Sequence, residues 1–192
     1  MSRLDRLIEA ERALVPRSRY ADKSKSWFMK LLNLVVRWFN RRFMTDFTTT
    51  VGVKTYFPPA LLDPRVVDDQ AVMVECHEFI HKWDYMQGRI AYWLKYTLSK
   101  KYRRDAELRG YTMNLYWYWL RYGTQDNPEN YVDHFTSSEY LYMERNGDYV
   151  RKELAARQQM FMEYEDQFLI QPGSEPYRLI KSFLKLEGIL HG

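Results

Sequence analysis

Hydrophobic positions recur every three or four residues through most of this 192-residue chain, a spacing that is typical of amphipathic helices. A first short helix is expected from about Arg3 to Leu14, before Pro16. The same spacing predicts longer helices over residues 67–87 and 103–122, and further helices toward the C-terminus. The chain is therefore expected to be predominantly helical.

A basic helix is expected after two N-cap candidates, Ser24 and Ser26. Its apolar stripe consists of Trp27, Leu31, Leu34, Val35, Trp38 and Phe39, and its basic residues include Lys30, Arg37, Arg41 and Arg42. We expect this stripe to cover the core while the long basic side chains lie in water. The alternative is that residues 23–44 lie on an anionic membrane surface or pack against a partner.

Residues 47–57 depart from the helical pattern. They read FTTTVGVKTYF, a run rich in β-branched and aromatic residues that alternates with a period of two, and Pro58 and Pro59 follow it. This segment is the strongest strand prediction in the chain. A strand among many helices predicts an α+β fold with a small sheet.

Composition and charge exclude several classes of protein. A chain with 46% hydrophobic residues, 8 Gly and 7 Pro is not of the disordered or low-complexity kind. The single cysteine, Cys76, excludes both an intrachain disulfide framework and a zinc site built from several cysteines. The net charge of +4 is too small to indicate a nucleic-acid partner, and none is expected.

The apolar stretches do not predict a secreted or membrane-spanning protein. The N-terminus mixes acidic and basic residues without the apolar centre of a secretory signal, so a cytoplasmic location is expected. The most apolar stretch, from Trp27 to Met44, is interrupted by basic residues and falls short of the roughly 20 apolar residues that a bilayer crossing needs. No transmembrane segment is expected.

The candidate chemistry lies in the helix predicted over residues 67–87, where HEFIH matches the pattern H-E-x-x-H. Four residues make slightly more than one helical turn, so His77 and His81 project from the same face and can bind one Zn²⁺. Glu78 is rotated by about 100° from His77 and can reach a zinc-bound water as a general base.

A catalytic zinc site of this kind needs a third protein ligand. Gln87 stands where a metzincin would place it, so the ligand has to come from another helix. The helix predicted over residues 103–122 offers Asp105 and Glu107, which point about 200° apart. We favour Glu107, because Gly110 lies one turn later and lets two helices approach closely. Asp105 is the structural alternative, and a surface salt bridge is the other role open to Glu107.

The order of TTTVGVKTYFPP, HEFIHKWDYMQG and DAELRGY resembles the small zincin metallopeptidases of the gluzincin type, whose third ligand is a Glu in an E-x-x-A-like motif. The similarity spans about Thr48 to Tyr111, and Gly110 stands where the family usually has Ala. The resemblance implies a zincin-like fold with a small antiparallel sheet, in which residues 47–57 form the edge strand along which a peptide lies. It also implies that His77, His81 and Glu107 are zinc ligands.

The same resemblance implies addition of water to a peptide bond, with Glu78 as the catalytic base. Similar enzymes stabilise the oxyanion with a Tyr or His from the C-terminal part, and His134 and Tyr140 are the nearest candidates. The sequence does not choose between them, and packing in the core is the alternative for each. Asp84 lies seven residues after His77, where it either orients an imidazole or pairs with a neighbouring basic residue.

Two functional hypotheses follow. The first is a zinc metallopeptidase that acts on a peptide or protein substrate. The second is a structural or assembly protein, for example a phage-encoded virion component, that has protein partners and retains a zincin-like domain without significant catalysis. In both, residues 1–45 are expected to form an N-terminal helical extension, and residues 46–192 the zincin-like domain.

Overall fold

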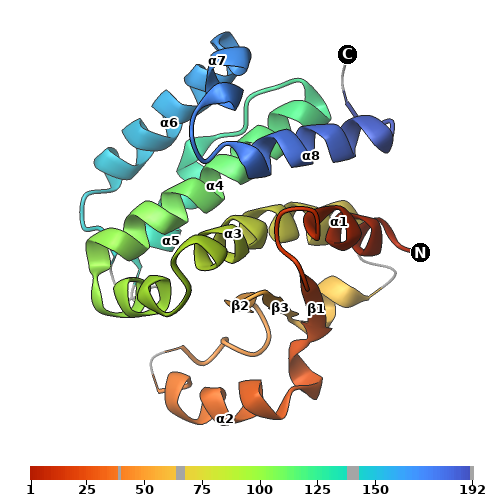
Figure 1. Cartoon of the computed structure of the whole chain (residues 1–192). Coiled ribbons are helices and arrows are strands. Elements are labelled where there is room, and N and C mark those ends of the chain that lie inside the picture. The colour runs from red at the N-terminus through yellow and green to blue at the C-terminus, as the bar shows by residue number, and fades with distance from the viewer. Residues whose placement is uncertain (39, 64–67, 138–142, 191–192) are drawn as a thin grey trace.

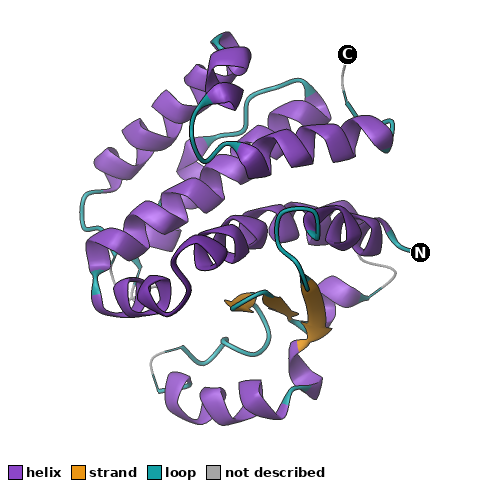
Figure 2. Cartoon of the chain, in the orientation of Figure 1, coloured by secondary structure: helices purple, strands orange, loops and turns teal. Residues whose placement is uncertain are grey.

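Two long helices, α3 (Asp68–Leu98) and α4 (Lys100–Tyr122), pack side by side through the middle of the molecule (Figure 1). The computed structural model describes residues 1–38, 40–63, 68–137 and 143–190, and these are mostly helical, with one small sheet (Figure 2). The other helices are α1 (Arg3–Glu11), α2 (Trp27–Val36), α5 (Asp133–Thr136), α6 (Gly147–Glu163), α7 (Glu165–Ile170) and α8 (Glu175–Leu186). Short 3-10 turns occupy Lys23–Lys25, Pro59–Leu62 and Pro128–Tyr131. The prediction of a predominantly helical α+β fold is confirmed.

These elements are arranged in layers around the α3–α4 pair (Figure 1). Helices α6 and α8 pack against α4, and α1 packs against α3 and α8. The sheet lies on the side of α3 that faces away from α4, and α2 lies beyond the sheet (Figure 1). The largest group of buried apolar side chains lies between α3, α4 and the C-terminal helices.

The sheet has three strands, β1 (Arg19–Asp22), β2 (Thr49–Val51) and β3 (Lys54–Phe57), in the order β1-β3-β2. Strand β1 is parallel to β3 and β2 is antiparallel to it, so the sheet is mixed and the prediction of a purely antiparallel sheet is wrong. Residues 19–22 read RYAD, which is too short and polar to show a strand pattern.

The prediction of one continuous edge strand at residues 47–57 is also wrong. Gly52 has a φ of +65°, which side chains other than glycine rarely adopt, and it turns the chain between β2 and β3. The segment therefore forms a hairpin. Within this hairpin only β2 lies at an edge of the sheet, because β3 is the central strand and β1 forms the opposite edge.

The first 45 residues are built into the packing of the rest of the chain. Helix α1 begins with a capping box in which Ser2 and Asp5 bond to each other's backbone. Beyond α1, the chain supplies β1 to the same sheet that carries β2 and β3. The N-terminal segment, expected from the sequence to be a helical extension, thus contains two helices and also contributes a strand.

The two long helices extend beyond their predicted ends. Helix α4 starts at Lys100, after an N-cap at Ser99, and ends before Gly123, which has a left-handed backbone. Helix α3 continues to Leu98, but Arg89 has φ 44° and ψ −122°, which breaks the regular helix next to Gly88. The final third of α3 therefore departs from the direction of the rest of the helix.

Helix α2 buries a different face from the one its sequence predicts. Met29 is fully buried, and Leu32 and Val36 pack with it against the sheet. Trp27 and Leu31, which belong to the expected core-facing stripe, are exposed. The helix is apolar on two sides, and the contacts with the sheet and the following loop decide which side is buried.

A buried ionic cluster joins the N-terminal segment to α3. The ammonium group of Lys82 donates to the carboxylates of Glu11, at 3.0 Å, and Glu75, and to the Ser18 hydroxyl at 2.9 Å. All four side chains are fully buried. Burial raises the pKa of Glu11 and Glu75, whereas the two carboxylates raise the pKa of Lys82 in spite of its burial. The cation is therefore required to compensate the acidic groups around it.

We expect Lys82→Met to lower the free energy of unfolding at pH 7 by about 3–5 kcal/mol, because it leaves two carboxyl groups buried without a cation. Since burial raises their pKa values in the folded state, the stability loss should grow as the pH rises and shrink in acid. Urea unfolding at several pH values measures both effects. The control is Lys152→Met on the exposed side of α6, with an expected change below about 0.5 kcal/mol. Equal losses in the two variants would contradict the role of Lys82.

Candidate metal centre

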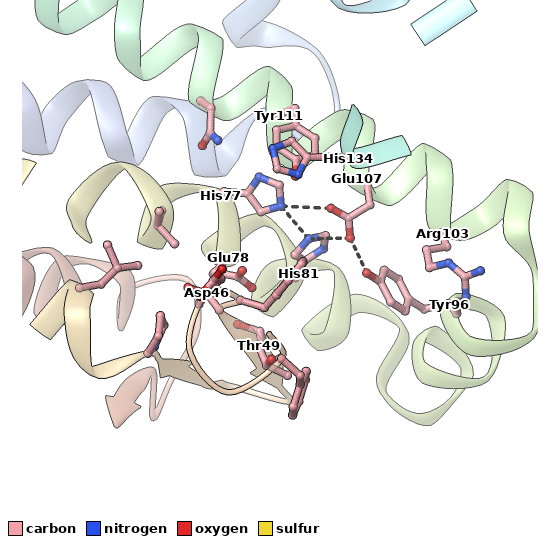
Figure 3. Close-up of a pocket in the computed structure, with 18 of the residues that line it drawn as sticks. Asp46, Thr49, His77, Glu78, His81, Tyr96, Arg103, Glu107, Tyr111 and His134 are labelled. Carbon is pink, nitrogen blue, oxygen red and sulfur yellow. Dashed lines mark hydrogen bonds and ion pairs between the residues drawn. The ribbon is translucent and has the colours of Figure 1, made fainter. Parts of the chain in front are cut away.

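Helices α3 and α4 bring two imidazoles and one carboxylate to a common point (Figure 3). His77 and His81 lie one turn apart on α3, and their Nε2 atoms are 3.1 Å from each other. Glu107 reaches them from α4, with Oε2 at 3.3 Å from His77 Nε2 and Oε1 at 3.4 Å from His81 Nε2. All three side chains are buried, so they form a group that could hold a metal ion.

The charges in this group favour an ionised carboxylate. Burial by itself would raise the pKa of Glu107, but the neighbouring imidazoles, His81 above all, hold it well below its usual range. Burial also opposes the charged form of His81, but the Glu107 carboxylate raises the pKa of His81 to about 9. Glu107 therefore stays negatively charged, as a metal ligand has to be.

Gly110 allows the two helices to approach this closely. A Cβ atom at this position would lie 2.6 Å from both Cε1 and Nε2 of His77, inside the van der Waals limit. The His77 ring therefore packs directly on the backbone of α4. The close approach expected from the sequence is present, and it leaves no room for an alanine side chain at this position.

Two tyrosines from the last part of α3 contact the cluster and line the same cavity. The Tyr92 hydroxyl is hydrogen-bonded to Nδ1 of His81 at 3.1 Å, and the Tyr96 hydroxyl donates to Oε1 of Glu107 (Figure 3). A straight helix would place residue 92 about 16 Å along the axis from residue 81. The break at Arg89 allows the chain to return to the site.

Sequence reasoning missed both tyrosines. The sequence does contain a signal that links them to the site. The residues His81, Asp84, Gly88, Tyr92 and Tyr96 follow helical spacing and would lie on one face of a straight helix. The spacing alone puts them out of reach of the histidines. Only the position of the break adds the information that they contact the ligands.

Glu78 lines a cavity of about 750 Å³ together with the three clustered residues. Its carboxylate makes no hydrogen bond to another described residue, and it lies beside His81, on the side facing Asp46 and Thr49 (Figure 3). The cavity is also lined by the edge strand β2, through Thr49 and Thr50. Glu78 is thus available to a molecule bound in the cavity.

Lys23 holds the chain that forms one rim of this cavity. Its buried ammonium group donates to the carbonyl oxygens of Phe43 and Phe47 at 2.7 and 2.8 Å, and to the hydroxyl of Thr49 at 2.7 Å. It also lies 3.5 Å from the centre of the Phe43 ring. Burial lowers the pKa of Lys23 to about 7, against the opposing charge of Glu78. The rim thus depends on a side chain from the N-terminal segment.

The remaining candidate residues are placed as follows. Asp84 pairs with Arg109 at 2.5 Å, so it has the ion-pair role that the sequence left open. It does not orient His81, because Nδ1 of that ring is hydrogen-bonded to Tyr92. Asp105 pairs with Arg104 and lies outside the cluster.

The two candidate oxyanion donors differ in what the structure describes. His134, on α5, lines the cavity and stacks on Tyr111, with 5.1 Å between ring centres. Tyr111 in turn contacts the His77 ring edge-on. Tyr140 lies outside the described residues.

Comparison of the chain with protein-family models, curated proteins and solved structures finds no match. Among the described residues, no helix combines the length and the apolar character that a membrane crossing requires.

We expect Tyr92→Phe to weaken metal binding by about 10- to 100-fold, because the hydrogen bond to Nδ1 orients the His81 ring and keeps Nε2 directed at the cluster. Tyr102→Phe is the matched control, since its ring contacts Tyr92 but its hydroxyl bonds to none of the three clustered residues. Competition with a chelator of known affinity measures the change. The positioning role fails if the two variants bind the metal equally well.

Proposed function

We propose that this protein is a zinc-dependent peptidase of the gluzincin type, with His77, His81 and Glu107 as zinc ligands. The observation that carries the proposal is the set of three ligand separations, 3.1, 3.3 and 3.4 Å. Two ligands at about 2.0–2.1 Å from a tetrahedral zinc lie about 3.3–3.4 Å apart. Two imidazoles and one carboxylate are also a donor set typical of catalytic zinc, with a fourth position left open.

The position of Glu78 supports a hydrolytic function. A bound zinc ion supplies Lewis-acid polarisation of a carbonyl group and lowers the pKa of water toward about 7. Glu78 follows His77 in the chain, lines the cavity, and makes no hydrogen bond to another described residue. Its carboxylate can accept the proton of the attacking water and return it to the departing amine.

The surroundings of the cluster support a peptide substrate. Strand β2 is an edge strand whose residues Thr49 and Thr50 line the cavity that contains Glu78. An edge strand offers backbone donors and acceptors to an extended peptide, which can add to the sheet. A cavity of about 750 Å³ is within the usual range for ligand sites.

His134 is the donor we propose for the oxyanion. It lines the same cavity, and its stacking on Tyr111, which packs against His77, limits the orientations of the ring. Tyr140 stays a sequence-based prediction.

We expect Glu78→Gln to lower the rate of peptide hydrolysis by about 10²- to 10⁴-fold, since the amide cannot accept the proton, while one equivalent of zinc remains bound. Peptide cleavage and metal content are measured on the same purified sample. Glu153→Gln, at a partly exposed position of α6, is the matched control and should retain full activity.

A double variant distinguishes the role of the metal from the role of Glu78. His77→Ala combined with His81→Ala should remove both the bound zinc and the activity. Full activity in Glu78→Gln would remove this residue from the mechanism. Bound zinc without hydrolysis in the unaltered protein would favour the structural or assembly role.

A further inference from the structure

We propose that the outward face of α2 binds the surface of an anionic phospholipid bilayer. This outward face consists of Trp27, Phe28, Leu31, Leu34, Val35 and Trp38, the last of which lies two residues beyond the end of the helix. The exposed fraction is 75% for Trp27, 63% for Val35 and 82% for Trp38. Large apolar side chains that are grouped and exposed to this degree indicate a binding surface.

The fold does not use this face. Helix α2 attaches to the protein through its opposite side, where Met29 is fully buried and Leu32 and Val36 pack near the sheet. With a helical rotation of about 100° per residue, the outward face spans an arc of about 120°. Both apolar sides are thus separately defined, and only one of them contributes to the core.

The charges beside the outward face suit an anionic partner. Lys30 and Arg37 lie along one flank, and Arg41 follows in the next turn. All three are exposed, and none pairs with a described carboxylate. Arg37 and Arg41 line, with Asn33 and Trp38, an open hollow of about 460 Å³. Two guanidinium groups around a hollow suit a lipid phosphate, because arginine binds phosphate through paired hydrogen bonds.

A bilayer fits this surface better than another protein does. Six apolar side chains on one helix fall well short of the roughly 20–30 residues per side of a stable protein interface. In contrast, an apolar face with basic residues beside it and tryptophans at both ends is typical of helices that lie in the membrane interface.

The attachment places the candidate metal centre near the bilayer. Val36, at the end of α2, and Asn40 and Phe43, which follow the helix in sequence, line the cavity. A bilayer bound to α2 would therefore lie close to the rim of the cavity. The binding itself does not depend on the metal or on hydrolysis.

The test is sedimentation of the full-length protein with vesicles of phosphatidylcholine, with and without phosphatidylglycerol. We expect binding to the anionic vesicles that weakens as salt is added, and much weaker binding to the neutral ones. Leu31→Glu with Leu34→Glu should lower the partition coefficient at least about tenfold, as should Arg37→Glu with Arg41→Glu. The control, Ile170→Glu with Leu186→Glu, alters apolar residues that are more exposed than Leu31 and Leu34 and lie on α7 and α8, at the opposite end of the molecule from α2, and should bind normally (Figure 1).

A fluorescence measurement covers the case in which a charged variant does not fold. Brominated lipids should quench tryptophan emission of the unaltered protein, and Trp27→Phe with Trp38→Phe should remove most of this quenching. The proposal is overturned if anionic vesicles do not bind at low salt, if neutral vesicles bind equally well, or if quenching persists without Trp27 and Trp38. A dimer in light scattering that Leu31→Glu with Leu34→Glu converts to a monomer, without vesicle binding, would instead assign the face to a second copy.

Discussion

The contact of the His77 ring with the backbone of α4 at Gly110 is the constraint on which the candidate site depends. The ring occupies the space that any side chain larger than hydrogen would need at position 110. This packing brings Glu107 of α4 within 3.4 Å of both imidazoles of α3. Since no local interaction within one helix can produce that arrangement, the chemistry of the cluster depends on the packing of the two longest helices.

The cluster is surrounded by groups from parts of the chain that are distant in sequence. Tyr92 and Tyr96 return to it because the helix breaks at Arg89. On the other side, Lys23 holds the loop that carries Phe43 and Phe47 against the edge strand. The three clustered residues are therefore held by contacts from distant segments, and Tyr92, Tyr96 and Glu78 all line the same cavity. Such supporting hydrogen bonds fix the orientation of the clustered side chains.

Buried cations tie the N-terminal segment to the rest of the fold. Lys82 of α3 meets Glu11 at the end of α1, and Lys23 bonds to the chain between α2 and β2. Each cation is enclosed by oxygen acceptors, which offset the cost of removing it from water. The same segment keeps the outward face of α2 exposed, because the contacts of Met29 and Phe43 with the sheet fix the rotation of this helix.

The sequence alone was enough to identify the features that follow from local periodicity. The spacing of His77 and His81, the separation of Asp105 from Glu107, and the small residue at position 110 are properties of single helices, and the structure shows the expected juxtaposition. Tertiary structure decided the rest. It set which apolar side of α2 is buried, paired the short β1 with β3, and used Gly52 and Arg89 to redirect the chain. These outcomes depend on contacts between residues far apart in the chain, and a pattern of three- and four-residue spacings contains no information about such contacts.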